Sequence, residues 1–263
     1  MKKEPSKLER YVQIATIFGV IITCIALIPA FGQWLYPTQP STPTILPPSQ
    51  TTNELIPLDV GKSLAMAYGN SAINYRSLLF TPLEQNNPNK YMLISESTLD
   101  DEINGHACSA SIDGTVFKKV DGTWVTETQQ IGIIELGGYC RAPDGKMIEF
   151  GTDTYGVLFE DGYSGAGILV GRYVFIAYFD NMFKVVLIAA NTFGSNEGEC
   201  GAKVPCWQYD SKIEFSQGEN PFFYNITITT SGTQNVNNEI LNLWKVQECF
   251  FSSSVLEYKC FPR

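Results

Sequence analysis

The longest apolar stretch of the chain runs from Tyr11 to Tyr36, and no charged residue occurs between Arg10 and Glu54. About 20 mainly apolar residues are needed to cross a hydrocarbon core about 30 Å thick, so this stretch is long enough for one transmembrane helix. Trp34 and Tyr36 at its outer end are typical of the membrane interface. We therefore expect residues 11–36 to span the lipid bilayer once.

Charge asymmetry predicts how this helix is oriented. The tail of residues 1–10 carries four basic side chains, whereas the next basic residue after the helix is Lys62. Basic residues favour the cytoplasmic side, so we expect a cytoplasmic N-terminus and a periplasmic or extracellular main domain. A cleaved signal peptide ending near Ala30-Phe31-Gly32 and a lipoprotein with Cys24 as the lipidated residue are the alternatives. The apolar run is longer than a signal peptide needs, and it continues past Cys24.

One face of the predicted helix carries small residues. Ala15, Gly19 and Thr23 recur every four residues, a spacing that lets a second helix approach closely. These residues are a candidate packing face toward a membrane or envelope protein partner, and a helix that faces only lipid is the alternative. Residues 37–53 follow, with five prolines and seven serines or threonines. This composition predicts an extended spacer.

The pattern changes after residue 54. Asp59 is a plausible N-cap for a helix that places Val60, Leu64, Ala67 and Tyr68 on one face and ends at Gly69-Asn70. A second short helix is expected over Ala72 to Leu79. From Tyr91 onward, short runs rich in β-branched and aromatic residues alternate with Gly, Asn and Asp, which predicts β-strands.

Two turns indicate that the strands are antiparallel. Asp121-Gly122 and Asp180-Asn181 each separate two β-prone runs by two residues that tolerate positive φ angles. Val174 to Phe179 is apolar at every position, which predicts a central strand that is covered on both faces. We therefore expect residues 54–263 to form a mainly β domain, either an antiparallel β-sandwich or a curved sheet, with a small N-terminal helical element.

Six cysteines follow the predicted membrane helix, and an even number on the exported side favours disulfides. Cys200 and Cys206 bracket a compact loop, Cys249 and Cys260 bracket a predicted hairpin, and Cys108 is left with Cys140. Zinc bound by these sulfurs and His106 is the alternative, but the paired spacing of structural zinc modules is absent. We therefore predict three disulfides and no metal.

Composition limits the partners. The whole chain has a net charge of −9 although its first ten residues are basic, so the outer part is strongly acidic. This charge disfavours nucleic acid as a partner. A loop rich in glycine, Gly165 to Gly171, precedes a strand and not a helix, so it does not predict a dinucleotide site, and no cofactor is expected.

No complete catalytic set stands out. The single histidine, His106, lies beside Cys108, and Gly162-Tyr163-Ser164-Gly165-Ala166 lacks the last glycine of a nucleophile elbow. Asp100 to Gly105 resembles the start of a calcium loop, but Ser111 stands where the bidentate glutamate belongs. Carboxylates available for glycoside hydrolysis are Glu135, Glu149, Glu160 and Asp161.

These observations favour a membrane-anchored binding or assembly module, an accessory part of a cell-envelope complex. The alternative is a membrane-tethered hydrolase that acts on cell-wall or surface glycans through a carboxylate pair.

Overall fold

The computed structural model describes residues 58–84, 87–97, 108–201, 203–218, 220 and 222–263. The predicted tail, membrane helix with Ala15, Gly19 and Thr23, and spacer all lie outside these residues, as do His106 and the acidic loop before it. Within the described ranges, no helix combines the length and the apolar character needed to cross a membrane.

The described chain is mainly β, with two antiparallel sheets and one short α-helix. Helix α2 (Val60–Tyr68) leads into a 3-10 helix, Gly69–Asn74. The first sheet contains β1 (Tyr75–Glu84), β2 (Asn87–Ser97), β3 (Ala110–Val120) and β4 (Thr123–Leu136). The second contains β5 (Lys146–Gly151), β6 (Thr154–Gly165), β7 (Ile168–Phe179), β8 (Met182–Ser195), β9 (Gln208–Ser216), β10 (Asn225–Val236), β11 (Glu239–Ser252) and β12 (Glu257–Pro262).

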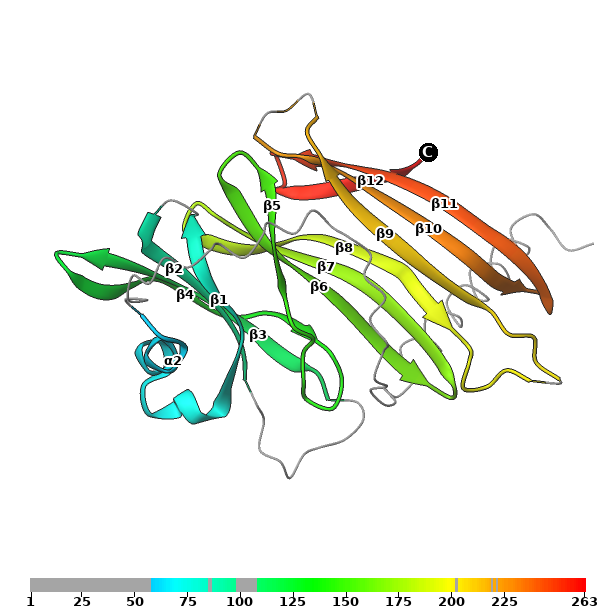
Figure 1. Ribbon diagram of the computed structural model, residues 1–263, viewed down its shortest axis with the longest axis horizontal. Helices are drawn as coiled ribbons and strands as arrows, with labels where there is room; N and C mark the ends of the chain where they lie inside the picture. Colours follow the sequence, from blue (N-terminus) through cyan, green and yellow to red (C-terminus); the bar gives the residue numbers. More distant parts are fainter. Residues whose placement is uncertain (1–57, 85–86, 98–107, 202, 219, 221) are drawn as a thin grey trace, which may run out of the picture.

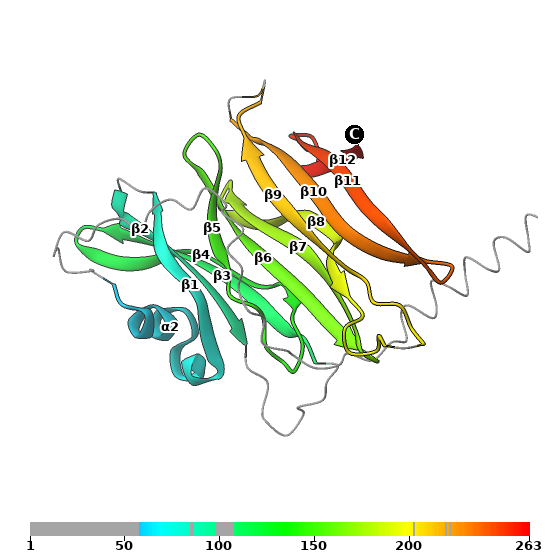
Figure 2. The same cartoon turned by 45° about the vertical axis from the view of Figure 1, so that its right-hand side comes forward.

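The eight-stranded sheet divides at its middle. Other neighbouring strands pair over most of the shorter strand, but β8 and β9 pair only at Gly194 with Tyr209 and at Ser195 with Gln208. The strands β9–β12 therefore diverge from β5–β8 and pack against one face of the layer that β5–β8 form. Figures 1 and 2 show β1–β4 with α2 on one side, β5–β8 in the middle and β9–β12 on the other side.

Strand β7 shows why the middle layer is central. Val174, Ile176 and Tyr178 belong to the core that this layer shares with the first sheet. Tyr173, Phe175 and Ala177 belong to the core that it shares with β9–β12. Alternate residues of a strand point to opposite faces, so a strand apolar at every position is buried on both sides, as the sequence predicts.

Local signals account for several other elements. The Asp59 side chain accepts a hydrogen bond of 2.7 Å from the Lys62 N–H and caps α2, and Gly69 ends this helix, as predicted. Asp121-Gly122 and Asp180-Asn181 have positive φ angles in the β3–β4 and β7–β8 turns. The Asp-Gly and Asp-Asn predictions are therefore confirmed.

The predicted second helix over Ala72 to Leu79 is wrong. The 3-10 helix ends at Asn74, and strand β1 begins at Tyr75. Antiparallel pairing with β2 aligns Tyr75 with Ser97 and Phe80 with Leu93. This pairing satisfies backbone groups and buries Leu78, so tertiary contacts override a short helical pattern.

Candidate functional site

The outward side of β9–β12, here called the outer face, carries the candidate site. Residues pointing inward from these strands include Ile213, Ile228 and Cys249, which are buried in the core. The residues that alternate with them point outward: Asp210, Lys212, Glu214, Thr227, Thr229, Ser231, Trp244, Val246, Glu248, Phe250, Lys259 and Phe261.

Large aromatic side chains are exposed on this outer face. Trp244 is 73% exposed, Phe261 is 54% exposed and Phe250 is 42% exposed. The rings of Phe250 and Phe261 lie 6.4 Å apart on neighbouring strands. Trp244 lies six residues from Phe250 along β11, about 20 Å away, so the exposed aromatic side chains are spread along the face. Aromatic side chains of this kind are enriched at interaction surfaces.

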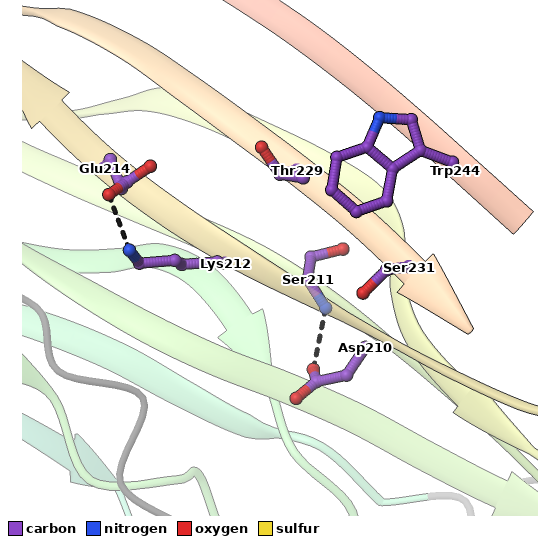
Figure 3. Close-up of a pocket in the computed structure, with 7 residues that line it drawn as sticks. All are labelled: Asp210, Ser211, Lys212, Glu214, Thr229, Ser231 and Trp244. Carbon is purple, nitrogen blue, oxygen red and sulfur yellow. Dashed lines mark hydrogen bonds and ion pairs between the residues drawn. The ribbon is translucent and has the colours of Figure 1, made fainter.

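Trp244 borders a shallow depression of about 470 Å³ on the outer face. Figure 3 shows its indole ring over β10, near Thr229 and Ser231. The strand register explains this arrangement, because Ser231 pairs with Trp244 on one side and with Asp210 on the other. The remaining lining residues are Ser211, Lys212 and Glu214 of β9.

The charged side chains of the depression interact with other residues of β9 but remain partly exposed to solvent. Lys212 and Glu214 form an ion pair of 2.6 Å, with about half of each side chain exposed, so the pair contributes little to stability. The Asp210 carboxylate accepts a hydrogen bond of 2.8 Å from the Ser211 N–H. Burial raises the pKa of Asp210, this hydrogen bond opposes the rise, and the nearby charge of Glu160 adds to it. The depression thus offers both signs of charge beside an aromatic ring.

Buried hydrogen bonds hold this region against the middle layer. The Tyr173 hydroxyl of β7 donates a hydrogen bond of 2.6 Å to the backbone carbonyl of Ser211. The hydroxyl groups of Ser211 and Thr230 share a hydrogen bond of 2.7 Å. All three residues are buried, so the backbone beneath the depression is fixed from inside while the outward side chains face solvent.

A glycine stands at the end of the β9–β10 pairing, close to the backbone of β9. Gly232 has a φ angle of 139°, and a Cβ atom on it would lie 2.3 Å from the Gln208 carbonyl oxygen. Only glycine fits this position without a shift of the backbone. Beyond it, the β10–β11 hairpin continues to its turn at Asn237-Asn238.

The structure contains the three predicted disulfides. Cys249–Cys260 joins paired residues of β11 and β12 beneath the outer face. Cys200–Cys206 closes a loop between β8 and β9. Cys108–Cys140 ties the residues before β3 to those after β4.

The four carboxylates that are candidates for glycoside hydrolysis do not form one site. Glu160 and Asp161 are adjacent on β6 and therefore point to opposite faces. Asp161 is buried and accepts hydrogen bonds of 2.7 Å from Arg172 and from the Gly137 N–H. Glu160 pairs with Lys146 at 3.1 Å, and Glu135 accepts a hydrogen bond from Ser109. Glu149 lies on β5.

The described residues contain no group of three or more His, Cys, Asp or Glu side chains that could hold a metal ion. Comparison with protein-family models, with curated protein sequences and with solved structures returns no match. The site is therefore interpreted from its own geometry, which defines a rigid sheet face with exposed aromatic side chains.

Proposed function

We propose that this protein is a membrane-anchored binding module whose outer face docks a protein partner of the cell envelope. In this proposal residues 11–36 cross the bilayer, the N-terminus is cytoplasmic, and the β domain lies in the periplasm or outside the cell. The observation that carries the proposal is the exposure of Trp244, Phe250 and Phe261 on one sheet face.

The composition of the outer face supports a protein partner. Tryptophan is among the residues that contribute most to binding energy at protein interfaces, and aromatic residues are enriched there. Lys212, Glu214, Glu248 and Lys259 stand around the aromatic side chains and provide charges of both signs. Such charges favour one partner and one orientation over others. The net acidity of the chain disfavours nucleic acid.

The proposal is tested by extracting the full-length protein from its native membrane in mild detergent and sizing it on a native gel. We expect a discrete assembly with a stoichiometric partner, which Trp244→Ala together with Phe261→Ala disrupts. Phe222→Ala is the matched control, because Phe222 is 67% exposed but lies outside β9–β12. An assembly that survives the double substitution, or its absence from the unsubstituted protein, contradicts the proposal.

A membrane-tethered glycan hydrolase is the second candidate, and Asp210 favours it. The carboxylate lies in the depression beside Trp244, and burial together with Glu160 raises its pKa, as a general acid requires. The other carboxylate of the depression is Glu214, four residues along the same strand and therefore about 13 Å away. That separation exceeds the roughly 5–9.5 Å of glycosidase carboxylate pairs, so Glu160 is the remaining candidate for the second role.

The two candidates make different predictions for one substitution. Asp210→Asn abolishes release of sugars from cell-wall glycans if the protein is a hydrolase. It leaves the native assembly intact if Trp244 and the aromatic residues carry binding. Glu160→Gln serves as the second hydrolase variant, and Lys146→Gln, which removes only its ion-pair partner, is the control.

A further inference from the structure

Part of β11 is an unpaired sheet edge within the described chain. Strand β11 pairs with β10 from Glu239 to Cys249, but β12 pairs only with Gln247 to Ser252. The seven residues Glu239 to Lys245, here called the free edge, therefore have no strand on their second side among the described residues.

The backbone direction of the free edge follows from one hydrogen bond. The Arg263 N–H donates a bond of 3.0 Å to the Val246 carbonyl, so Val246 points its backbone groups toward the β12 side. Backbone direction alternates along a strand. Ile240, Asn242 and Trp244 therefore point their N–H and C=O groups outward at the free edge.

The free edge has neither the proline nor the bulge that usually prevents association, and its charged residues, Glu239 and Lys245, stand at its two ends. Edge strands in soluble proteins are commonly interrupted by proline, by a bulge or by inward-pointing charge. Here the sequence is EILNLWK, without proline, and the β10–β11 register has no shift. Ile240, Leu241 and Trp244 are exposed.

We propose that two copies of this protein associate through their free edges, in antiparallel register about a two-fold axis at Asn242. This register places Glu239 opposite Lys245, Ile240 opposite Trp244, and Leu241 opposite Leu243 of the second copy. Each charge meets an opposite charge, and each apolar side chain meets an apolar one. Self-association goes beyond the proposed function and does not depend on it.

Backbone geometry favours the same register. Ile240 of one copy and Trp244 of the other both point outward at the edge, as do the two Asn242 residues, so each pair exchanges two N–H···O bonds. The strand of the second copy ends at its Asn237-Asn238 turn, which lies opposite Val246 of the first copy. There the Val246 carbonyl already accepts a hydrogen bond from the Arg263 N–H of its own chain. The open length of the edge therefore matches the strand that fills it.

Registers with the axis moved by one residue, which shifts the pairing by two residues, are less favourable. With the axis at Leu243, Leu241 faces Lys245 and Asn242 faces Trp244. Ile240 of the second copy also competes with Arg263 for the backbone carbonyl of Val246. With the axis at Leu241, Glu239 faces Leu243. Mismatches between charged and apolar side chains forgo the cross-strand pairs that stabilise antiparallel strands.

Crosslinking of the full-length protein in its membrane tests the register, in a Cys24→Ser background so that the thiol in the predicted membrane helix does not contribute. Differently tagged Leu241→Cys and Leu243→Cys chains are expressed together. Directly opposite residues in a pair without mutual hydrogen bonds have Cα atoms about 4.5 Å apart, within disulfide range. We expect a crosslinked band that carries both tags, and little or none when either variant is expressed alone. Its absence, or equal crosslinking of Leu241→Cys to itself, overturns the proposal.

A charge swap provides a second test that leaves the edge backbone intact. Among the described residues, neither Glu239 nor Lys245 forms an ion pair within its own chain. Glu239→Lys alone places two lysines opposite each other twice in the dimer, so we expect its dissociation constant in detergent to rise roughly tenfold. Glu239→Lys together with Lys245→Glu restores the pairing and the affinity. Single and double variants that associate equally overturn the proposal. This result is independent of whether the assembly with a protein partner through Trp244 is found.

Discussion

The two outward sides of the layered stack differ in what covers them. On the first sheet, helix α2 packs over Leu93 and Phe117, which have no exposed surface, and Leu58 is buried with them. On β9–β12, Trp244, Phe250 and Phe261 are all more than 40% exposed. The same chain thus covers Leu93 and Phe117 of one outward side with its own helix and leaves three large aromatic side chains of the other exposed. This contrast supports a binding role for the outer face.

Polar groups follow the same division. Beneath α2, the buried Asp113 carboxylate accepts hydrogen bonds from the Gly132 N–H at 2.8 Å and from the Tyr68 hydroxyl at 3.3 Å. Tyr68 also shares a hydrogen bond of 2.6 Å with Ser95. On the outer face, Lys212 and Glu214 are half exposed and, within the described ranges, form an ion pair with each other. Tyr68, Ser95 and Asp113 on the covered side thus bond to one another beneath the helix, whereas the Lys212–Glu214 pair on the outer face stays half exposed to solvent.

The largest expected difference between the two sides is in stability. Phe117→Ala removes a fully buried ring from beneath α2, so we expect the free energy of unfolding to fall by about 3–5 kcal/mol. Phe250→Ala makes the same chemical change at an exposed position and should cost under about 1 kcal/mol. Denaturant unfolding in detergent, followed by tryptophan fluorescence, measures both. Equal losses would remove the distinction between a covered and an open side.

A hydroxyl deletion makes a smaller change to the covered side. Tyr68→Phe keeps the ring that stacks on Tyr75 with centroids 3.5 Å apart, but removes the hydrogen bonds to Ser95 and Asp113. Because buried polar atoms lose a partner, we expect a loss of about 1–2 kcal/mol in the free energy of unfolding. Tyr163→Phe, at an exposed tyrosine of β6, is the control and should change stability by less than about 0.5 kcal/mol. A Tyr68 variant as stable as this control would show that the buried network contributes nothing.

Several parts of the fold are predictable because their signals are local. The N-cap at Asp59, the two-residue turns and the doubly apolar run through Val174 to Phe179 each depend on a few neighbouring residues. The cysteine pairing follows from short loops and elimination, and the structure contains the same pairs.

The candidate site is less predictable, for a physical reason. The β10–β11 hairpin continues past Thr230 to Asn237-Asn238, and there it is exposed on both sides. In the β10 half, Ser231 to Asn235 are all polar residues or glycine and give no alternation, so the sequence pattern does not mark them as a strand. The depression also combines residues of β9, β10 and β11, and only the register brings them together. The one available signal is Trp244, a large aromatic residue next to Lys245 in the β-prone run that leads to Cys249.

The smallest expected effect concerns the pH dependence of the covered side. Burial raises the pKa of Asp113 above its usual value, although the hydrogen bonds from Gly132 and Tyr68 oppose this. The folded protein therefore holds this proton to a higher pH than the unfolded chain does. Stability from this group is fully present below the ordinary carboxyl pKa of about 3.9 and is lost as the pH rises through the raised value. Asp113→Asn removes this loss, so relative to the unsubstituted protein its stability should increase as the pH rises from about 4 to 7.

Glu127 is the matched control because its pKa shift has the opposite sign. Burial raises its pKa, but hydrogen bonds and charges from Lys90 and Lys118 outweigh burial, so the net pKa is lowered. A lowered carboxyl pKa contributes stability that is present above the ordinary pKa and is lost as the pH falls. Glu127→Gln should therefore lose stability relative to the unsubstituted protein as the pH rises over the same interval. Urea unfolding at several pH values measures both, and parallel curves for the two variants would contradict the buried, internally satisfied role of Asp113.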